Sequence, residues 1–98
     1  MTSIEIGNSV TEIGSGAFWG CRSLKNIVIP DSVTEIGSGA FRGCENLTSI
    51  VIPDSVTTIG ELAFYGCMTL EKICVSKGKV DYFKRLLPAE LHDKIVER

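Results

Sequence analysis

The sequence lacks the residue sets on which most catalytic and metal sites are built. It holds one histidine, His92, and its four cysteines include no C-x-x-C pair, so neither a histidine-based triad nor a zinc site is indicated. The phosphate-binding patterns G-x-G-x-x-G and G-x-x-x-x-G-K are also absent. The sequence therefore predicts a protein that is not an enzyme and binds no metal or cofactor, with His92 a polar residue of a C-terminal cap.

The sequence also lacks an excess of positive charge and a long apolar run. Ten Lys and Arg residues stand against 12 Asp and Glu residues, a net charge of −2, which argues against a nucleic-acid partner. No apolar run approaches the roughly 20 residues that span a bilayer, so no membrane insertion is predicted. The first residues show no secretory signal pattern. A hydrophobic content of 44% in 98 residues suits one folded domain.

Proline is scarce, at 3 residues, whereas glycine is frequent, at 10, and the glycines recur with a period of 23 residues. The repeated units are Ile6–Val28, Ile29–Val51 and Ile52–Cys74. One such unit cannot bury its apolar side alone, so we predict a repeat solenoid. The expected form is a short right-handed coil, with a parallel β-sheet on one face and short helical or 3-10 turns on the other.

Each unit has a strand half and a turn half. The run 24–29 ends in β-branched residues before Pro30, which predicts a strand with Leu24, Ile27 and Ile29 in the core. Gly37 then changes the chain direction, and Ser38 is expected to cap a short helical turn that Gly43 closes in a left-handed conformation. Stacking the units predicts an aromatic column of Phe18, Phe41 and Phe64.

The two ends of the array differ. After residue 75 the period stops, and the spacing predicts a helix from Val80 to Leu87, then a second helix from Pro88 through Ile95. We therefore divide the chain into repeats at 1–75 and a helical C-terminal cap at 76–98. At the other end Met1 stands where the repeats have leucine, as in a chain that begins within an array.

The first strand is predicted to be an uncapped sheet edge, with Ile4, Glu5 and Ile6 as a candidate self-association site. This edge would pair with another copy of the chain, as a homodimer, or with upstream repeats. The alternative is that Glu5 and fraying blunt the edge and leave a monomer.

Three of the cysteines, Cys21, Cys44 and Cys67, follow the period. They could form a disulfide or metal site, but free cysteine behaves as a small hydrophobe, and we favour a column of buried thiols. Cys74 replaces a valine on the outer strand face, where an exposed thiol is expected. The glycosylation pattern at Asn46 contains Leu47, a predicted core residue, and is interpreted as chance.

Two surfaces are candidates for protein binding. One is the outer strand face, an apolar row flanked by polar side chains: Val28, Val51 and Cys74, with Asn26, Ser49 and Lys72. The other is a ridge on the turn side formed by Trp19, Arg42 and Tyr65, where Arg42 would make cation–π contacts. Each has a purely structural alternative, namely β-branched strand filling for the row and self-packing for the ridge.

The unit L-x-x-I-x-I-P-x-S-V-x-x-I-G-x-x-A-F-x-G-C-x-x-L, read from Leu24 to Leu47 and from Leu47 to Leu70, resembles the BspA-type leucine-rich repeat. The resemblance implies a leucine-rich-repeat solenoid of a cell-surface or secreted protein that takes part in adhesion and binds host matrix or cell-surface proteins. Family members generally carry many repeats, whereas this chain carries three. The rival hypothesis is structural: the chain terminates a longer array.

Overall fold

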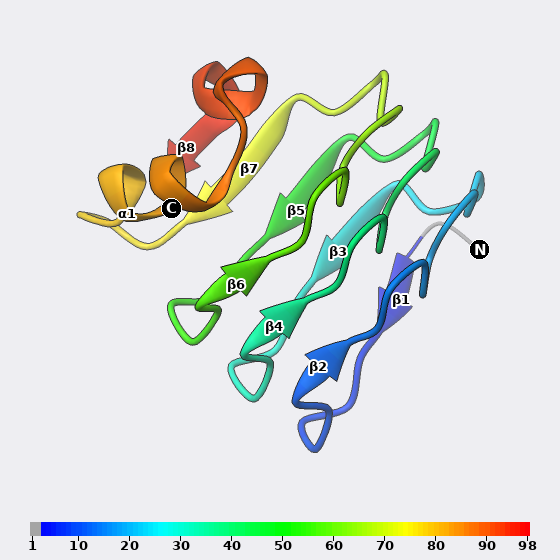
Figure 1. The fold of residues 1–98 in the computed structure, drawn as a ribbon, viewed down its shortest axis with the longest axis horizontal. Helices are drawn as coiled ribbons and strands as arrows, with labels where there is room; N and C mark the ends of the chain where they lie inside the picture. The colour runs from blue at the N-terminus through cyan, green and yellow to red at the C-terminus, as the bar shows by residue number, and fades with distance from the viewer. Residues whose placement is uncertain (1–2) are drawn as a thin grey trace.

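The computed structural model describes residues 3–98 as a stack of coils with two parallel sheets (Figure 1). The larger sheet has the order β1-β3-β5-β7-β8, and the smaller has the order β2-β4-β6. Strands of the larger sheet are β1 (Ser3–Glu5), β3 (Asn26–Val28), β5 (Ser49–Val51), β7 (Lys72–Val75) and β8 (Ile95–Glu97). Strands of the smaller sheet are β2 (Glu12–Ile13), β4 (Glu35–Ile36) and β6 (Thr58–Ile59).

The register of the larger sheet follows the sequence period. Ile27 pairs with Ile50 and Ile50 with Ile73, so neighbouring strands are offset by one unit of 23 residues. All three isoleucines are buried, as are Leu24 and Ile29. The predicted parallel sheet and its core-facing residues are confirmed, because a period shared by every unit places equivalent residues side by side.

The smaller sheet was not predicted from the sequence. Its strands have two residues each, too short to show the alternation that marks a strand. They form because the next coil supplies partners: the Thr34 amide donates to the Thr11 carbonyl and the Gly37 amide to the Ile13 carbonyl, both at 2.7 Å.

The aromatic column is confirmed. The Phe18 and Phe41 ring centroids lie 5.2 Å apart, and those of Phe41 and Phe64 lie 5.4 Å apart, with nearly parallel planes. Phe41, the middle ring, is fully buried. The column runs through the core behind the turns, so it ties the three units together.

The expected short helix around Phe41 is a run of hydrogen-bonded turns with no helix assigned. Its amides alternate: those of Ala40 and Arg42 bond three residues back, whereas those of Gly39, Phe41 and Gly43 bond to carbonyls of the next unit. Gly43 has φ +74°, which confirms its left-handed conformation. A helix would keep every bond inside the unit, and this turn shares them with its neighbour.

The C-terminal cap consists of α1 (Val80–Leu86), the 3-10 helix η1 (Ala89–Lys94) and β8. The first predicted helix is confirmed, but a helix through Ile95 is wrong, because Ile95 begins a strand parallel to β7 and is buried. Helix α1 packs through buried Phe83, and the Tyr82 hydroxyl donates to the Val56 carbonyl at 2.7 Å. Among the described residues, no helix has the length and apolar character to cross a membrane.

At the opposite end of the larger sheet lies β1, which pairs on one side with β3 (Figure 1). The backbone of Ile4 and Glu5 forms part of this edge strand, and Ile6 packs against the core. Met1 and the side chains of Ile4 and Glu5 lie outside the described part of the chain. The predicted self-association of this edge therefore stays a prediction.

Candidate protein-binding surfaces

The outer face of the larger sheet carries the predicted rows. Val28, Val51 and Cys74 are register partners, and Val96 of β8 extends their row. Val28 is 62% exposed, which is high for a valine on a strand. The polar row of Asn26, Ser49 and Lys72 runs beside it, and the Ser49 hydroxyl donates to Asn26 Oδ1 at 2.6 Å. The sequence therefore placed both rows correctly.

Cys74 departs from its prediction as an exposed thiol, because it is half-buried. The reason is β8, which pairs Val96 directly with Cys74 and so covers a strand that would otherwise form the sheet edge. The sequence pattern did not reveal this strand, since Ile95–Glu97 lies outside the period.

A hollow of about 790 Å³ is lined by residues of β3 and β5, by the turns that follow them and by Arg98. The apolar row contributes Val28 and Val51 to its lining, while Asp31 and Arg98 bring charges of opposite sign. The remaining lining residues are Ile6, Asn8, Asn26, Ile27, Ile29, Pro30 and Pro53. Apolar and polar groups thus meet in one concave region, which is the composition of a recognition surface.

The ridge on the turn side is ordered as predicted. The Arg42 guanidinium carbon lies 4.7 Å from the Trp19 ring centroid and 5.1 Å from that of Tyr65. Both rings are 59% exposed, so the arginine is held between two aromatic side chains that still face solvent. Cation–π contacts at such sites stabilise by about 0.5–1 kcal/mol each. The ridge is therefore a preformed surface of the residue types that dominate protein interfaces.

The periodic cysteines are free thiols. Cys44 Sγ donates to the Phe18 carbonyl and Cys67 Sγ to the Phe41 carbonyl, each at 3.1 Å. Burial raises the pKa of the Cys67 thiol to about 12, and burial also raises the pKa of Cys44. Both thiols stay protonated at neutral pH. The predicted column of buried thiols is confirmed at Cys44, whereas Cys21 and Cys67 are half-buried and pack against the edge of the core.

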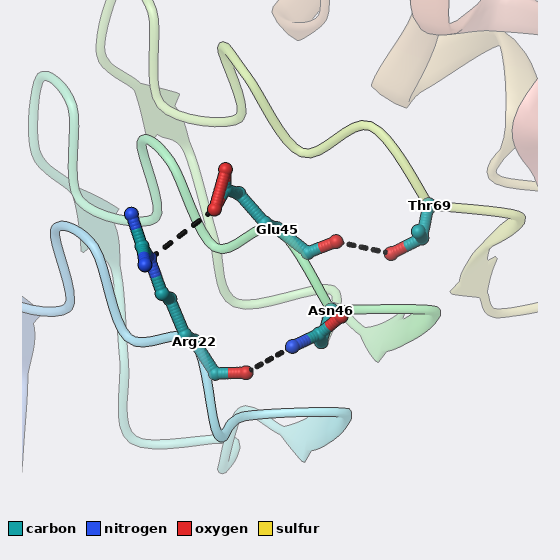
Figure 2. Close-up of polar contacts among 4 residues, drawn as sticks. All are labelled: Arg22, Glu45, Asn46 and Thr69. Carbon is teal, nitrogen blue, oxygen red and sulfur yellow. Dashed lines mark hydrogen bonds and ion pairs between the residues drawn. The ribbon is translucent and has the colours of Figure 1, made fainter.

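Polar contacts between successive units occupy the loop after each turn (Figure 2). Arg22 pairs with Glu45 at 3.2 Å, the Asn46 amide donates to the Arg22 carbonyl at 2.6 Å, and Thr69 donates to the Glu45 carbonyl at 2.8 Å. The ion pair is exposed to solvent, so it adds less than about 1 kcal/mol to the free energy of unfolding. The Asn46 amide is engaged, and Leu47 is fully buried.

The remaining candidates for chemistry are dispersed. His92 Nε2 lies 2.9 Å from the Leu87 carbonyl, a contact within the cap. Over the described range 3–98, no three His, Cys, Asp or Glu side chains are grouped to hold a metal ion.

The sequence did not reveal an apolar cleft of about 940 Å³ between the last turn and the cap. Leu62 and Met68 line it, 52% and 85% exposed, opposite Leu86 and Leu91 of the cap. A signal was present: Leu62 stands where the earlier units have glycine, and Met68 where they have Arg22 and Glu45.

Comparison with known proteins agrees with this architecture. The family model described as the BspA type leucine rich repeat region matches residues 1–86. A crystal structure of a leucine rich cell surface protein from Faecalibacterium prausnitzii A2-165 matches with 42% identity and a TM-score of 0.78. That match covers 85% of this chain and 22% of the other, so this chain spans about a fifth of that protein's length. Among curated proteins, none matches this chain.

Proposed function

The chain belongs to the BspA-type leucine-rich repeat family, and from this premise we propose that it is a non-catalytic protein-binding module that serves adhesion. The observation that carries the proposal is the ridge, where Arg42 is fixed between Trp19 and Tyr65 while both rings remain exposed. Trp, Tyr and Arg are the residue types most often found to dominate binding energy.

The rigidity of the ridge supports this function. Binding orders side chains at a cost of about 0.5–1.5 kcal/mol for each one immobilised. The stacking on Arg42 already restricts both rings in the free protein, so a partner that binds them loses little further side-chain entropy. The outer strand face adds a second contact area, because Val28 is exposed at the hollow.

The proposed partner is a host matrix or cell-surface protein, and the proposed location is the cell surface or the secreted fraction. The Faecalibacterium relative is described as a cell surface protein, and this chain corresponds to part of its length. The small net charge and the mixed lining of the hollow suit a protein ligand better than a polyanion.

The test measures binding of the chain to immobilised matrix proteins by surface plasmon resonance. Trp19→Ala and Val28→Lys are expected to weaken binding at least about tenfold, as for an interface anchor. Glu12→Ala and Thr58→Lys are the controls, because they make a truncation and a lysine substitution at exposed positions of the smaller sheet, outside both surfaces. Equal affinities for all four variants would refute the assignment of these surfaces.

A second candidate function is structural: residues 76–98 would terminate a repeat array. It is favoured by β8, which pairs with β7, and by α1, whose Phe83 is buried in the core. In this function the β1 edge, at Ile4, Glu5 and Ile6, would pair with another copy or with further repeats. Ile95→Lys tests the cap, because the substitution is expected to detach β8, expose the β7 edge and cause aggregation that light scattering measures. A variant that stays as soluble as the wild type would refute the capping function.

A further inference from the structure

Three backbone amides of the last turn have no hydrogen-bond partner among residues 3–98. In the turn before it, the amides of Gly39, Phe41 and Gly43 donate to carbonyls of the last turn, at 3.1, 2.8 and 2.8 Å. The equivalent amides of the last turn, which donate to no group in the described part of the chain, are those of Leu62, Phe64 and Gly66. The backbone of this turn therefore offers three donors at alternate residues.

A backbone carbonyl beside these amides is also open. In the interior, the Gly37 amide donates to the Ile13 carbonyl and the Gly60 amide to the Ile36 carbonyl, both at 2.7 Å. The equivalent carbonyl of the last unit, at Ile59 of β6, accepts no hydrogen bond from residues 3–98, and β6 is the edge strand of its sheet. Because backbone polar groups need partners when they leave water, these four groups favour a ligand that is itself a backbone.

Leu62 is held in a backbone conformation that the fold does not require. Its φ is +60°, and among residues 3–98 it is the one non-glycine residue with a positive φ. The earlier units have Gly16 and Gly39 at this position, with φ of +66° and +63°. A leucine in this conformation is strained, and its side chain is 52% exposed, so burial in the core does not offset the strain. Strain of this kind is typical of binding sites.

The open groups border the apolar cleft of about 940 Å³ between the last turn and the cap. Its walls are apolar, with Leu62 and Met68 opposite Leu86 and Leu91. Its charged lining residues, two carboxylates and one ammonium, are Glu61, Glu90 and Lys94. The cleft therefore suits an apolar ligand that offers carbonyl groups and carries positive charge.

The space beside β7 decides between a further repeat and a short segment as the occupant. A repeat unit, or a second copy of this chain, docked as the interior units are would bring a strand to the free side of β7, where β8 already lies. A short segment brings no such strand. Segments that add to an open backbone edge gain affinity from main-chain hydrogen bonds and specificity from their side chains.

We propose that this cleft binds a short peptide segment of a partner protein, rich in glycine, with apolar side chains and one cationic side chain. Carbonyls of the segment accept from the open amides, and one of its amides donates to the Ile59 carbonyl. Tyr65 lines the cleft while Arg42 lies over its ring at 5.1 Å, so the cation of the segment can lie on the other face of the ring. The site lies outside the outer strand face and shares one residue, Tyr65, with the ridge.

The interior of the array supplies a probe for this site. Residues 36–43 read I-G-S-G-A-F-R-G, and the Ser38, Ala40 and Arg42 carbonyls accept from the preceding turn at 3.0, 2.7 and 2.8 Å. A synthetic peptide of this sequence with blocked ends carries one positive charge. The control peptide has alanine in place of its first glycine, because a Cβ at Gly37 or Gly60 would clash with the backbone of the unit before it.

The test is an amide NMR titration of the isotope-labelled 98-residue chain with each peptide. The probe is expected to bind with a Kd on the order of 10⁻⁴–10⁻³ M, with the largest shifts at the amides of Leu62, Phe64 and Gly66. The control peptide should bind at least about tenfold more weakly. Glu90→Lys should weaken binding of the probe severalfold, whereas Glu71→Lys, the same charge change at an exposed position outside the cleft, should not.

Leu62→Gly separates binding from a structural role of Leu62. It restores the glycine of the earlier units, so the melting temperature should stay equal or rise, while the affinity for the probe should fall roughly fivefold or more. A lowered melting temperature with unchanged affinity overturns the proposal.

No saturable shift at the three amides up to about 10⁻² M probe also overturns it. So do shifts that depend on the concentration of the chain alone, because they assign the open amides to self-association. These results do not depend on binding to matrix proteins, so failure of that function and failure of this site are distinguishable.

Discussion

Replacing Gly37 by alanine should destabilise the fold although Gly37 has no positive φ. The added Cβ would lie 2.5 Å from the Ser15 amide nitrogen and 2.8 Å from the Gly14 carbonyl carbon, both backbone atoms of the preceding unit. These atoms cannot move without breaking the hydrogen bonds between the first two turns, in which the Gly16 amide donates to the Ser38 carbonyl at 3.0 Å. Overpacking of this kind costs about 1–3 kcal/mol.

The same change at Gly14 is the internal control, because it occupies the equivalent position with no atom within 4 Å. There alanine should stabilise the chain by about 0.4–1 kcal/mol, since it restricts the unfolded state. The effect on the unfolded state is common to both variants, so they should differ by about 1–3 kcal/mol, the cost of overpacking at Gly37.

The assay is urea unfolding at low protein concentration, followed by far-UV circular dichroism, with thermal melts beside it. One kcal/mol shifts the melting temperature of a domain of this size by about 4–8 °C, so the difference is easily measured. Equal stability of the Gly37→Ala and Gly14→Ala chains would refute the reasoning, because it would mean that the units do not approach as closely as the structure shows.

Three further predictions concern the core and the ridge. Phe41→Ala should lower the free energy of unfolding by about 3–5 kcal/mol in urea titrations, because it removes the buried middle ring of the column. The stability contributed by the buried Cys67 thiol should be fully present below pH 9 and should fall as the pH rises from 9.0 toward about 12, because the folded state holds the thiol proton more tightly than the unfolded state does. A plot of the free energy of unfolding against pH should therefore be flatter for Cys67→Ala than for the wild type. Arg42→Gln should destabilise by about 1 kcal/mol and change the fluorescence of Trp19, because two cation–π contacts are lost. Unchanged fluorescence would contradict the stacked arrangement.

Much of the fold was predictable because the information repeats along the chain. A residue such as Ile27, Ile50 or Ile73 is apolar in every unit, so its burial could be deduced by comparing units. The same comparison placed Trp19, Arg42 and Tyr65 in one ridge, since a column of stacked units brings equivalent positions together.

The features that escaped prediction involve contacts between dissimilar segments. Strand β8 pairs with β7 although Ile95–Glu97 shares no period with it, and this pairing half-buries Cys74. The smaller sheet escaped because a two-residue strand carries no recognisable alternation. The cleft beside Leu62 and Met68 depends on where the cap lies, which local patterns do not encode.

The sequence by itself determined the period, the parallel register, the buried residues and the family, because a unit that cannot bury its apolar side alone must stack on its copies. Only the tertiary structure decided the hydrogen bonds between successive turns and the close contact that requires Gly37. The physical reason is that these properties belong to the contact between units. A repeat shows which residues meet, whereas the direction of each amide and the space left for a Cβ follow from the backbone geometry of the assembled stack.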